Sequence, residues 1–279
     1  MNVLRLHCDD KPGIVAAVAT CLANNECNIE ESAQFNDPLS GQFFMRVVFS
    51  ALQEGSLERF NEHFTKIADQ LSMTWEVCDL TKPLKTLVMV SKDDHCLNDL
   101  LYRQKSKLTP VEITAIVSNH ETCREIAQRH DIPFHYLPVT KETKAHQEAA
   151  LVNIIEETHS ELITLARYMQ ILSNKLSNQY EGRIINIHHS FLPGFKGARP
   201  YHQAYERGVK IIGATAHFAS PDLDEGPIIE QEIMRITHSF TPQKMQAAGR
   251  DIESRVFSRA VNLYAERRIF LHDGRTVIL

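Results

Sequence analysis

The sequence predicts an α/β protein of two domains, in which a small N-terminal domain precedes a larger domain with a mostly parallel sheet. The length of 279 residues exceeds that of most single domains. Over the first 80 residues, the apolar side chains switch repeatedly between the period of a strand and that of a helix. After residue 86, short apolar runs alternate with helical segments, which is typical of a parallel sheet covered by helices.

The first domain is expected to follow the order βαββαβ. Phe43, Met45 and Val47 alternate as in a strand, whereas Phe60 and Phe64 belong to a series with the three- and four-residue spacings of a helix. The predicted strands cover 3–8, 28–36, 42–50 and 73–77, and the predicted helices cover 12–24 and 57–71. This order is that of the ferredoxin-like split βαβ arrangement.

The second domain is expected to be Rossmann-like. Because Pro83 interrupts strand pairing and the hydrophobic pattern restarts after it, the predicted boundaries are 1–80 for the first domain, 81–85 for a linker and 86–279 for the second domain. The predicted strands cover 87–90, 113–117, 134–137, 162–166, 184–187, 211–218 and 228–236. The predicted helices cover 96–105, 121–130, 143–157, 170–180 and a long segment from Thr241-Pro242 to about residue 268.

The composition argues against several classes of function. A formal charge of -5 and a pI near 6.3 predict no nucleic-acid partner. No run approaches the roughly 18 apolar residues of a membrane-spanning helix, and charges occur early, so we expect a cytoplasmic protein without a membrane segment or a signal peptide. The six cysteines form no C-x-x-C pair, which predicts free thiols.

Polar side chains stand at the ends of two predicted strands, where binding sites of α/β sheets gather. The first strand ends in Asn186, His188 and His189. Because side chains alternate along a strand, Asn186 and His188 share one face, and His189 is expected to point the opposite way. The second strand contains His217 and leads into an acidic, turn-rich loop that contains Asp224.

Asn186, His188 and Asp224 have the chemistry required for attack on an acyl carbon. The amide of Asn186 can donate a hydrogen bond to a developing oxyanion, and the imidazole of His188 can transfer a proton near neutral pH. A nearby carboxylate, Asp224, can orient a water, take its proton and hold the imidazole in the useful state. Spacing alone leaves a second interpretation open, in which His188 is a hydrogen-bonded core histidine.

A metal site is the other chemistry considered for these side chains. His188 and His189 diverge on a strand, and His217 and Asp224 do not complete a recognised ligand set with them. We therefore expect no metal.

Ordered segments between residues 85 and 279 resemble the folate-dependent formyltransferase family. They are Asn186-Ile187-His188-His189-Ser190-Phe191-Leu192-Pro193, His217-Phe218 and Leu223-Asp224-Glu225-Gly226-Pro227. The resemblance implies that Asn186, His188 and Asp224 are catalytic, with His189 and His217 as candidate supporting residues; His217 either orients Asp224 or only packs.

A further segment, Leu165-Ala166-Arg167-Tyr168-Met169-Gln170-Ile171-Leu172, resembles the strand and loop whose main chain binds the pterin in that family. Gln170 stands where the family commonly has arginine. The resemblance implies folate contacts at Leu165, Met169, Gln170, Leu172, Ala219, Ser220 and Leu223.

The turn Asp10-Lys11-Pro12-Gly13-Ile14-Val15, together with Asn28-Ile29, resembles the ACT family of regulatory domains. The resemblance implies a homo-oligomer, dimer or tetramer, and a small amino-acid effector such as glycine or methionine. Asp10, Gly13 and Asn28 are the candidate effector-binding residues. The alternative is a domain that only assembles subunits.

The first loop of the second domain bears on the acceptor of the formyl group. Family members that formylate glycinamide ribonucleotide have a Gly-Asn-Gly-Ser-Asn loop that cradles the substrate phosphate. The corresponding stretch here, Ser91-Lys92-Asp93-Asp94-His95-Cys96, lacks glycine and contains two carboxylates that would repel a phosphate. An RNA acceptor would call for a basic appended domain, whereas the net charge of this chain is negative. Water is therefore the expected acceptor.

The whole chain resembles the hydrolytic members of the formyltransferase family, which join an ACT-like domain to this catalytic domain. The resemblance implies hydrolysis of 10-formyltetrahydrofolate without a cofactor, which supplies formate for purine synthesis and balances the one-carbon folate pool. Formyl transfer to glycinamide ribonucleotide and a non-catalytic folate or amino-acid sensor are the alternatives. Lys196 and His202 either bind the glutamate tail of the folate or face solvent.

Overall fold

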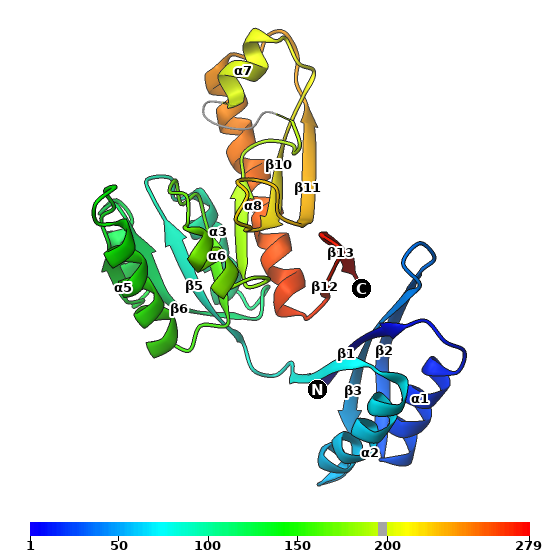
Figure 1. The fold of residues 1–279 in the computed structure, drawn as a ribbon. Coiled ribbons are helices and arrows are strands. Elements are labelled where there is room, and N and C mark those ends of the chain that lie inside the picture. Colours follow the sequence, from blue (N-terminus) through cyan, green and yellow to red (C-terminus); the bar gives the residue numbers. More distant parts are fainter. Residues whose placement is uncertain (195–199) are drawn as a thin grey trace. The chain divides into compact units, whose positions relative to one another are not determined.

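The computed structural model describes residues 1–194 and 200–279, and the chain forms two compact units (Figure 1). The first unit contains Met1–Lys82 with Glu266–His272 and Val277–Leu279. The second unit contains Pro83–Ala265 with Asp273–Thr276. The sequence prediction assigned all of 86–279 to the second domain. The end of the chain instead belongs largely to the first unit, because it packs on the sheet of that unit.

The first unit contains a four-stranded antiparallel sheet. Its elements are β1 (Asn2–Asp9), α1 (Ile14–Asn24), β2 (Cys27–Asp37), β3 (Gln42–Ala51), α2 (Ser56–Leu71) and β4 (Thr74–Asp79). The strands lie in the order β2-β3-β1-β4, and each neighbouring pair is antiparallel. The βαββαβ order expected from the apolar periodicity is therefore the observed one.

The core of the first unit lies between this sheet and the two helices. Phe49, Phe60 and Phe64 are fully buried, and the rings of Phe60 and Phe64 stack with centroids 5.1 Å apart. The end of the chain contributes β12 (Ile269–His272) to the same unit. The ring of Phe270 there contacts the ring of Phe44 edge-on at 5.7 Å.

The second unit is built on a seven-stranded sheet. Its strands are β5 (Leu84–Val90), β6 (Val111–Ser118), β7 (Phe134–Tyr136), β8 (Leu162–Leu165), β9 (Ile184–His188), β10 (Ile211–Phe218) and β11 (Ile228–Arg235). They lie in the order β11-β10-β9-β8-β5-β6-β7. The strands from β9 to β7 are parallel, and β10 and β11 add antiparallel strands at one edge.

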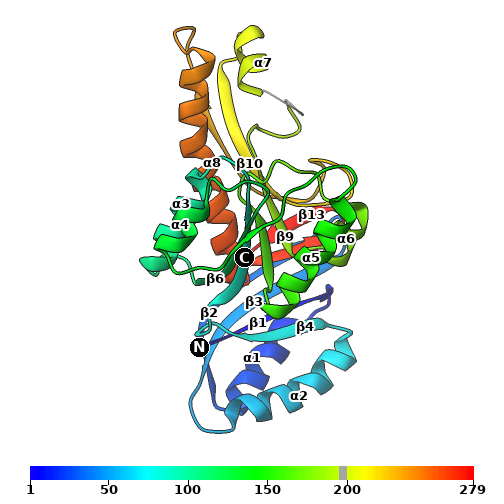
Figure 2. The same ribbon diagram turned by 90° about the vertical axis from the view of Figure 1, so that its left-hand side faces the viewer.

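Helices cover both faces of this sheet, with α3 and α4 on one side and α5 and α6 on the other (Figure 2). The helices are α3 (His95–Lys105), α4 (Arg124–Arg129), α5 (Lys144–Glu157), α6 (Asn174–Gln179), α7 (Pro200–Glu206) and α8 (Pro242–Ala265). The predicted cap of the long helix is present, since the hydroxyl oxygen of Thr241 accepts a hydrogen bond from the Lys244 amide at 3.3 Å.

Several elements differ from the expectation. The helix predicted at 170–180 begins only at Asn174, because Ser173 caps it and accepts a hydrogen bond from the Leu176 amide at 3.2 Å. Residues 170–172 are therefore a loop. The short elements α7, β12 and β13 (Arg275–Ile278) had no recognisable period in the sequence.

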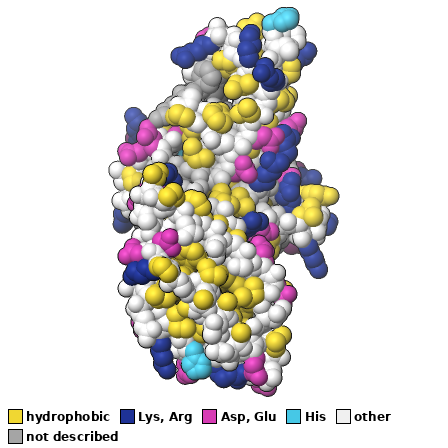
Figure 3. Space-filling view, turned by 90° about the vertical axis from the view of Figure 1, so that its right-hand side faces the viewer, with side chains coloured by type: hydrophobic (Ala, Val, Ile, Leu, Met, Phe, Trp, Pro, Cys, Tyr) yellow, Lys and Arg dark blue, Asp and Glu magenta, His cyan; other side chains and the backbone are white. Residues whose placement is uncertain are grey.

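Two further features concern the length of the helices and the distribution of surface charge. Among the helices of residues 1–194 and 200–279, none is long and apolar enough to cross a membrane. On the face that Figure 3 shows, Lys and Arg side chains are interspersed with Asp and Glu rather than gathered into one basic area.

Candidate functional site

A cleft of about 240 Å³ opens in the second unit beyond the carboxyl ends of β8 and β9. This is the edge of a parallel sheet at which ligands bind. All the predicted catalytic, supporting and folate-contact residues lie together in its lining. The lining residues are Leu165, Arg167, Tyr168, Met169, Gln170, Ile171, Leu172, Ser177, Asn186, Ile187, His188, His189, His217, Ala219, Ser220, Pro221, Leu223 and Asp224.

Asn186 and His217 face each other across two neighbouring strands. The antiparallel register of β9 and β10 places them directly opposite. Asn186 Nδ2 lies 3.1 Å from His217 Nε2, and His217 Nδ1 lies 2.8 Å from the main-chain oxygen of Phe218. His217 is only 2% exposed, so both ring nitrogens have protein partners in a buried setting.

These partners determine the tautomer of His217. Burial lowers the pKa of the His217 ring, so the ring is neutral at pH 7 and has a single N–H. The Phe218 carbonyl can only accept, which places that hydrogen on Nδ1. Nε2 is then an acceptor, and the Asn186 amide must donate to it. The amide nitrogen of Asn186 is thereby fixed, with its second N–H left to donate elsewhere.

His188 and Asp224 form the second pair of the site. His188 Nδ1 lies 3.2 Å from Asp224 Oδ1, and the two side chains are 6% and 8% exposed. Burial alone would raise the pKa of Asp224, but the hydrogen bond from His188 and the neighbouring imidazoles hold that pKa below its usual value. The site therefore contains an ionised carboxylate in contact with an imidazole.

The loop that holds Asp224 folds tightly against the end of β10. The Phe218 amide donates a hydrogen bond to the Pro227 carbonyl at 2.9 Å. Gly226 makes this possible, since a Cβ atom at that position would lie 1.8 Å from the main-chain oxygen of Phe218. Asp224 itself has a left-handed backbone, with φ of 58°, which aspartate tolerates better than most residues.

His189 also lines the cleft, which corrects the expectation that it points away from His188. Strand β9 ends at His188, so the alternation of side chains no longer applies to residue 189. Burial, followed by the charges of Arg167 and His188, lowers the pKa of His189 to about 4. The ring is therefore neutral at pH 7, and its buried Nδ1 has no hydrogen-bond partner among the described residues.

The loop after β8 forms the wall that was predicted to bind the pterin. Arg167 has a left-handed backbone, with φ of 63°. The Met169 amide donates a hydrogen bond to the Ser91 hydroxyl oxygen at 2.9 Å, and the Ser91 hydroxyl donates to Asn119 Oδ1 at 2.6 Å. That main-chain amide is therefore already bonded, whereas the side chains of Met169 and Ile171 are 56% and 60% exposed.

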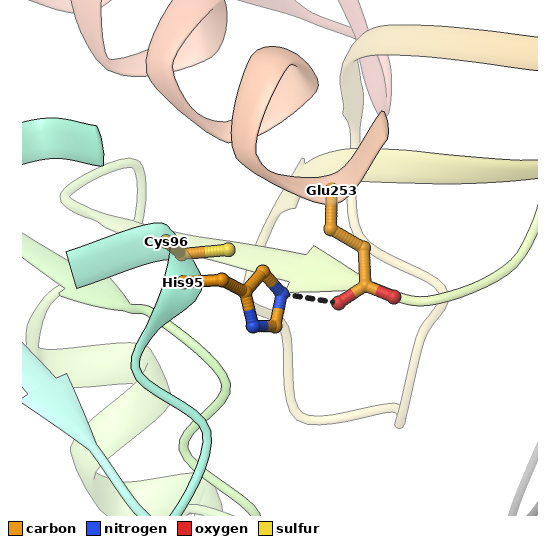
Figure 4. Close-up of side chains that lie close together, drawn as sticks. All are labelled: His95, Cys96 and Glu253. Atoms are coloured by element: carbon orange, nitrogen blue, oxygen red, sulfur yellow. Dashed lines mark hydrogen bonds and ion pairs between the residues drawn. The ribbon is translucent and has the colours of Figure 1, made fainter. Parts of the chain in front are cut away.

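A buried polar group beside the cleft centres on Glu253 of α8. We name it the Glu253 cluster; its members are His95, Arg167, Tyr201 and Glu253. Glu253 Oε2 accepts a hydrogen bond from His95 Nε2 at 2.8 Å, as Figure 4 shows, and lies 3.3 Å from Arg167 Nε. Glu253 Oε1 accepts a hydrogen bond from the Tyr201 hydroxyl at 2.6 Å.

Two members of the Glu253 cluster, together with Cys96, are of types that ligate metals. His95, Cys96 and Glu253 have ligand atoms within 4.8 Å of one another (Figure 4). Both oxygens of Glu253 are already bonded, and a guanidinium group beside the carboxylate disfavours a second cation. Burial raises the pKa of the Cys96 thiol well above its usual value, which opposes formation of the thiolate that a metal requires. The arrangement is that of a buried ion-pair network.

The structure brings together only part of the predicted effector set. Asp10 and Gly13 line a second cavity, in the first unit, together with Asn36 of β2. Asn28 is absent from that lining because it pairs with Ser50 at the opposite end of β2. The sequence left two possible roles for His202 and Lys196, either binding the glutamate tail of the folate or facing solvent. His202 is exposed on α7, and Lys196 lies outside the described residues.

Sequence reasoning did not select the Glu253 cluster. Arg167 was part of the pterin-loop motif, but His95, Tyr201 and Glu253 come from three distant segments. A usable signal was Gly249, a glycine inside the predicted long helix. A Cβ atom there would lie 1.9 Å from the Tyr201 hydroxyl oxygen, so this glycine gives Tyr201 access to Glu253.

This chain is similar to known proteins in both sequence and structure. Residues 84–261 match the family model of formyl transferases. Over its full length the chain is 45% identical to a formyltetrahydrofolate deformylase from Corynebacterium sp. (strain P-1), of which it covers 98%. The crystal structure of a formyltetrahydrofolate deformylase from Burkholderia mallei is similar at a TM-score of 0.94 and 48% identity, covering 100% of this chain and 99% of that one.

A phosphoribosylglycinamide formyltransferase from Anaplasma phagocytophilum is less similar. Its crystal structure has a TM-score of 0.65 and 30% identity, and the match covers 71% of this chain and 95% of that one. The expected formyltransferase fold with a mostly parallel sheet is confirmed. The chain therefore belongs to the formyl transferase family and, along its whole length, to the group within it that includes the formyltetrahydrofolate deformylases.

Proposed function

We propose that this protein hydrolyses 10-formyltetrahydrofolate to formate and tetrahydrofolate, in the cytoplasm and without a cofactor. The proposal is supported by its full-length similarity to formyltetrahydrofolate deformylases and by the side chains of the cleft. The formate released would supply purine synthesis and balance the one-carbon folate pool.

The reaction requires three functions from the cleft. Folate binds with its formyl oxygen toward Asn186 and His188, where the free N–H of Asn186 donates to the developing oxyanion. The ionised Asp224 orients a water and takes its proton as the water attacks the formyl carbon. The proton taken from the water reaches N10 through His188 as the tetrahedral intermediate collapses, so Asp224 is ionised again when formate leaves.

His217 acts in this proposal as a positioning residue for Asn186 and not as an orienter of Asp224. Its Nε2 lies 3.1 Å from Asn186 Nδ2 but 3.8 Å from Asp224 Oδ1. In the neutral tautomer Nε2 and the carboxylate are both acceptors, so no hydrogen bond joins them. The imidazole therefore orients the amide so that nitrogen, rather than oxygen, faces the reacting carbonyl.

The main support for water as the acceptor of the formyl group comes from residues 91–96. Three of the polar side chains are engaged within the protein: Ser91 contacts the Met169 amide and Asn119, Asp93 pairs with Arg167 and Arg250, and His95 contacts Glu253. Asp93 and Asp94 also place negative charge before α3. This stretch is poorly suited to the phosphate of a second substrate.

One assay separates hydrolysis from its alternatives. The enzyme is supplied with 10-formyltetrahydrofolate, with and without glycinamide ribonucleotide, and formate is measured. We expect formate at the same rate in both cases, because no acceptor other than water is required. Turnover only with glycinamide ribonucleotide would indicate a transferase, and folate binding without turnover would indicate a sensor.

The first unit is, in this proposal, an ACT-like domain that dimerises or tetramerises the protein and binds a small amino acid such as glycine or methionine. Its βαββαβ order and the cavity beside Asp10 and Gly13 support this role. Asn36 Nδ2 donates to Asp10 Oδ2 at 2.8 Å, so the carboxylate is held at the rim of that cavity. Ile29 and Phe35 on the edge strand β2 are 37% and 41% exposed, which suits a subunit contact.

The effector role predicts that glycine or methionine changes the rate of formate release. Asp10→Ala should abolish that change without altering the rate in the absence of amino acid, because the cavity is separate from the catalytic cleft. Asp69→Ala, at an exposed position of α2, is the matched control and should keep the response. An unchanged amino-acid response in Asp10→Ala would contradict this role.

A further inference from the structure

The chain leaves the sheet and turns directly after His188. Strand β9 ends at that residue, and the turn that follows it contains Ser190 and Leu192. Ser190 and Leu192 are 4% and 3% exposed, so the turn lies inside the protein rather than in solvent. Its buried main-chain groups therefore need hydrogen-bond partners within the protein. Side chains from β10 and β11 supply several of them.

The hydroxyl of Thr215 on β10 binds the main chain of the turn at two points. It donates a hydrogen bond to the Ser190 carbonyl at 2.9 Å and accepts one from the Leu192 amide at 3.0 Å. It also accepts a hydrogen bond from Gln231 Nε2 at 2.9 Å. These three bonds use the single donor and both acceptor positions of a hydroxyl, in a side chain that is fully buried.

Gln231 on β11 completes the contacts with the turn. Its Nε2 also donates a hydrogen bond to the Leu192 carbonyl at 3.0 Å. The amide and the carbonyl of Leu192 are thus both bound by side chains of the neighbouring strands. We call Thr215 and Gln231 the brace.

The brace and His188 form one row across three neighbouring strands. Thr215 lies directly opposite His188 of β9 and directly opposite Gln231 of β11. Residues paired in this way point to the same face of the sheet, with Cβ atoms about 4.5–5.5 Å apart. Thr215 therefore stands beside His188 and also binds the chain two residues beyond it.

We propose that Thr215 and Gln231 are positioning residues that hold His188 in place for proton transfer. The inference rests on the proposed hydrolysis, in which His188 carries the proton to N10. Without the Thr215 hydroxyl, the Ser190 carbonyl and the Leu192 amide each lose a buried hydrogen bond, so the turn must rearrange. Because the turn begins next to His188, that rearrangement displaces the imidazole. A displacement of about 1 Å at a reacting group can lower the rate on the order of 10²-fold.

The test compares Thr215→Val with Thr215→Ser. Valine has nearly the same shape as threonine but no hydroxyl, whereas serine keeps the hydroxyl. Formate release is measured against the concentration of 10-formyltetrahydrofolate, at a temperature at which circular dichroism shows each variant to be folded. We expect kcat to fall on the order of 10²-fold in Thr215→Val, with a much smaller change in KM, and Thr215→Ser to restore most of kcat.

Thr86→Val is the matched control. Thr86 is equally buried in the same sheet, on β5, and its hydroxyl donates to the Leu84 carbonyl at 3.1 Å. Its kcat should equal that of the parent, because this hydroxyl binds no part of the turn after β9. A folded Thr215→Val with parental kcat would overturn the inference, as would a loss confined to KM, an equal loss in Thr86→Val, or no recovery in Thr215→Ser.

A second variant applies if Thr215→Val does not fold. Gln231→Met removes the amide donors of the brace at a partly exposed position, and the same fall in kcat at a nearly constant KM is expected. Parental kcat in Gln231→Met would then overturn the inference. Failure of the proposed function is distinct, since the parent enzyme itself would release no formate from 10-formyltetrahydrofolate in water.

Discussion

Asp224→Asn is expected to lower kcat for formate release by on the order of 10³–10⁴-fold, by analogy with the loss of the carboxylate in other histidine–carboxylate sites. Asparagine has nearly the same shape but cannot take a proton from water or stabilise a positive imidazole. The hydrogen bond that His188 donates to Asp224 Oδ1 could persist, so the fold should be retained. The expected loss is therefore in kcat, with little change in KM.

Asp222→Asn is the matched control for this variant. Asp222 lies in the same loop, but its side chain is exposed and does not line the cleft. We expect parental turnover in Asp222→Asn, and similar thermal unfolding in both variants. Turnover of a folded Asp224→Asn within tenfold of the parent would rule out the carboxylate as the base.

Asn186→Ala is expected to lower kcat by about 10²–10³-fold, which is the typical effect of removing one oxyanion donor. The change also leaves His217 Nε2 without the hydrogen bond that it accepts at 3.1 Å. Because the amide acts mainly on the developing negative charge, KM for 10-formyltetrahydrofolate should change much less than kcat.

Asn98→Ala provides the comparison for Asn186→Ala, since Asn98 is exposed on α3. Its kcat should match that of the parent. A loss in Asn186→Ala that appears entirely in KM would assign this amide to substrate binding and would contradict its role as an oxyanion donor.

Most secondary structure was predictable because the apolar period is a local property. Phe43, Met45 and Val47 alternate in β3, and Phe60 and Phe64 lie one turn apart in α2, as their spacing predicted. The start of α6 was predicted too early. The apolar pattern extends to residues before Ser173, but the cap at Ser173 makes the helix begin at Asn174. The two strands near the end of the chain, β12 and β13, were missed.

The candidate catalytic residues could be selected from the sequence because they stand at strand ends and carry a family motif. The sequence could not show that His217 bonds Asn186, because that contact depends on the register between β9 and β10. The Glu253 cluster was beyond local reasoning for the same reason, since His95 and Glu253 are 158 residues apart. The direction of the His189 side chain was predicted wrongly, because the alternation of side chains was assumed to continue beyond His188, where the strand ends.

The most direct test of the account is the source of the oxygen in the product formate. Turnover of 10-formyltetrahydrofolate in water enriched in ¹⁸O, with no amine added, should give formate that contains one ¹⁸O atom from the solvent. This follows because a water oxygen bonds to the formyl carbon before the bond to N10 breaks. Formate without solvent oxygen, or no turnover until an amine is supplied, would contradict hydrolysis at the Asn186, His188 and Asp224 site.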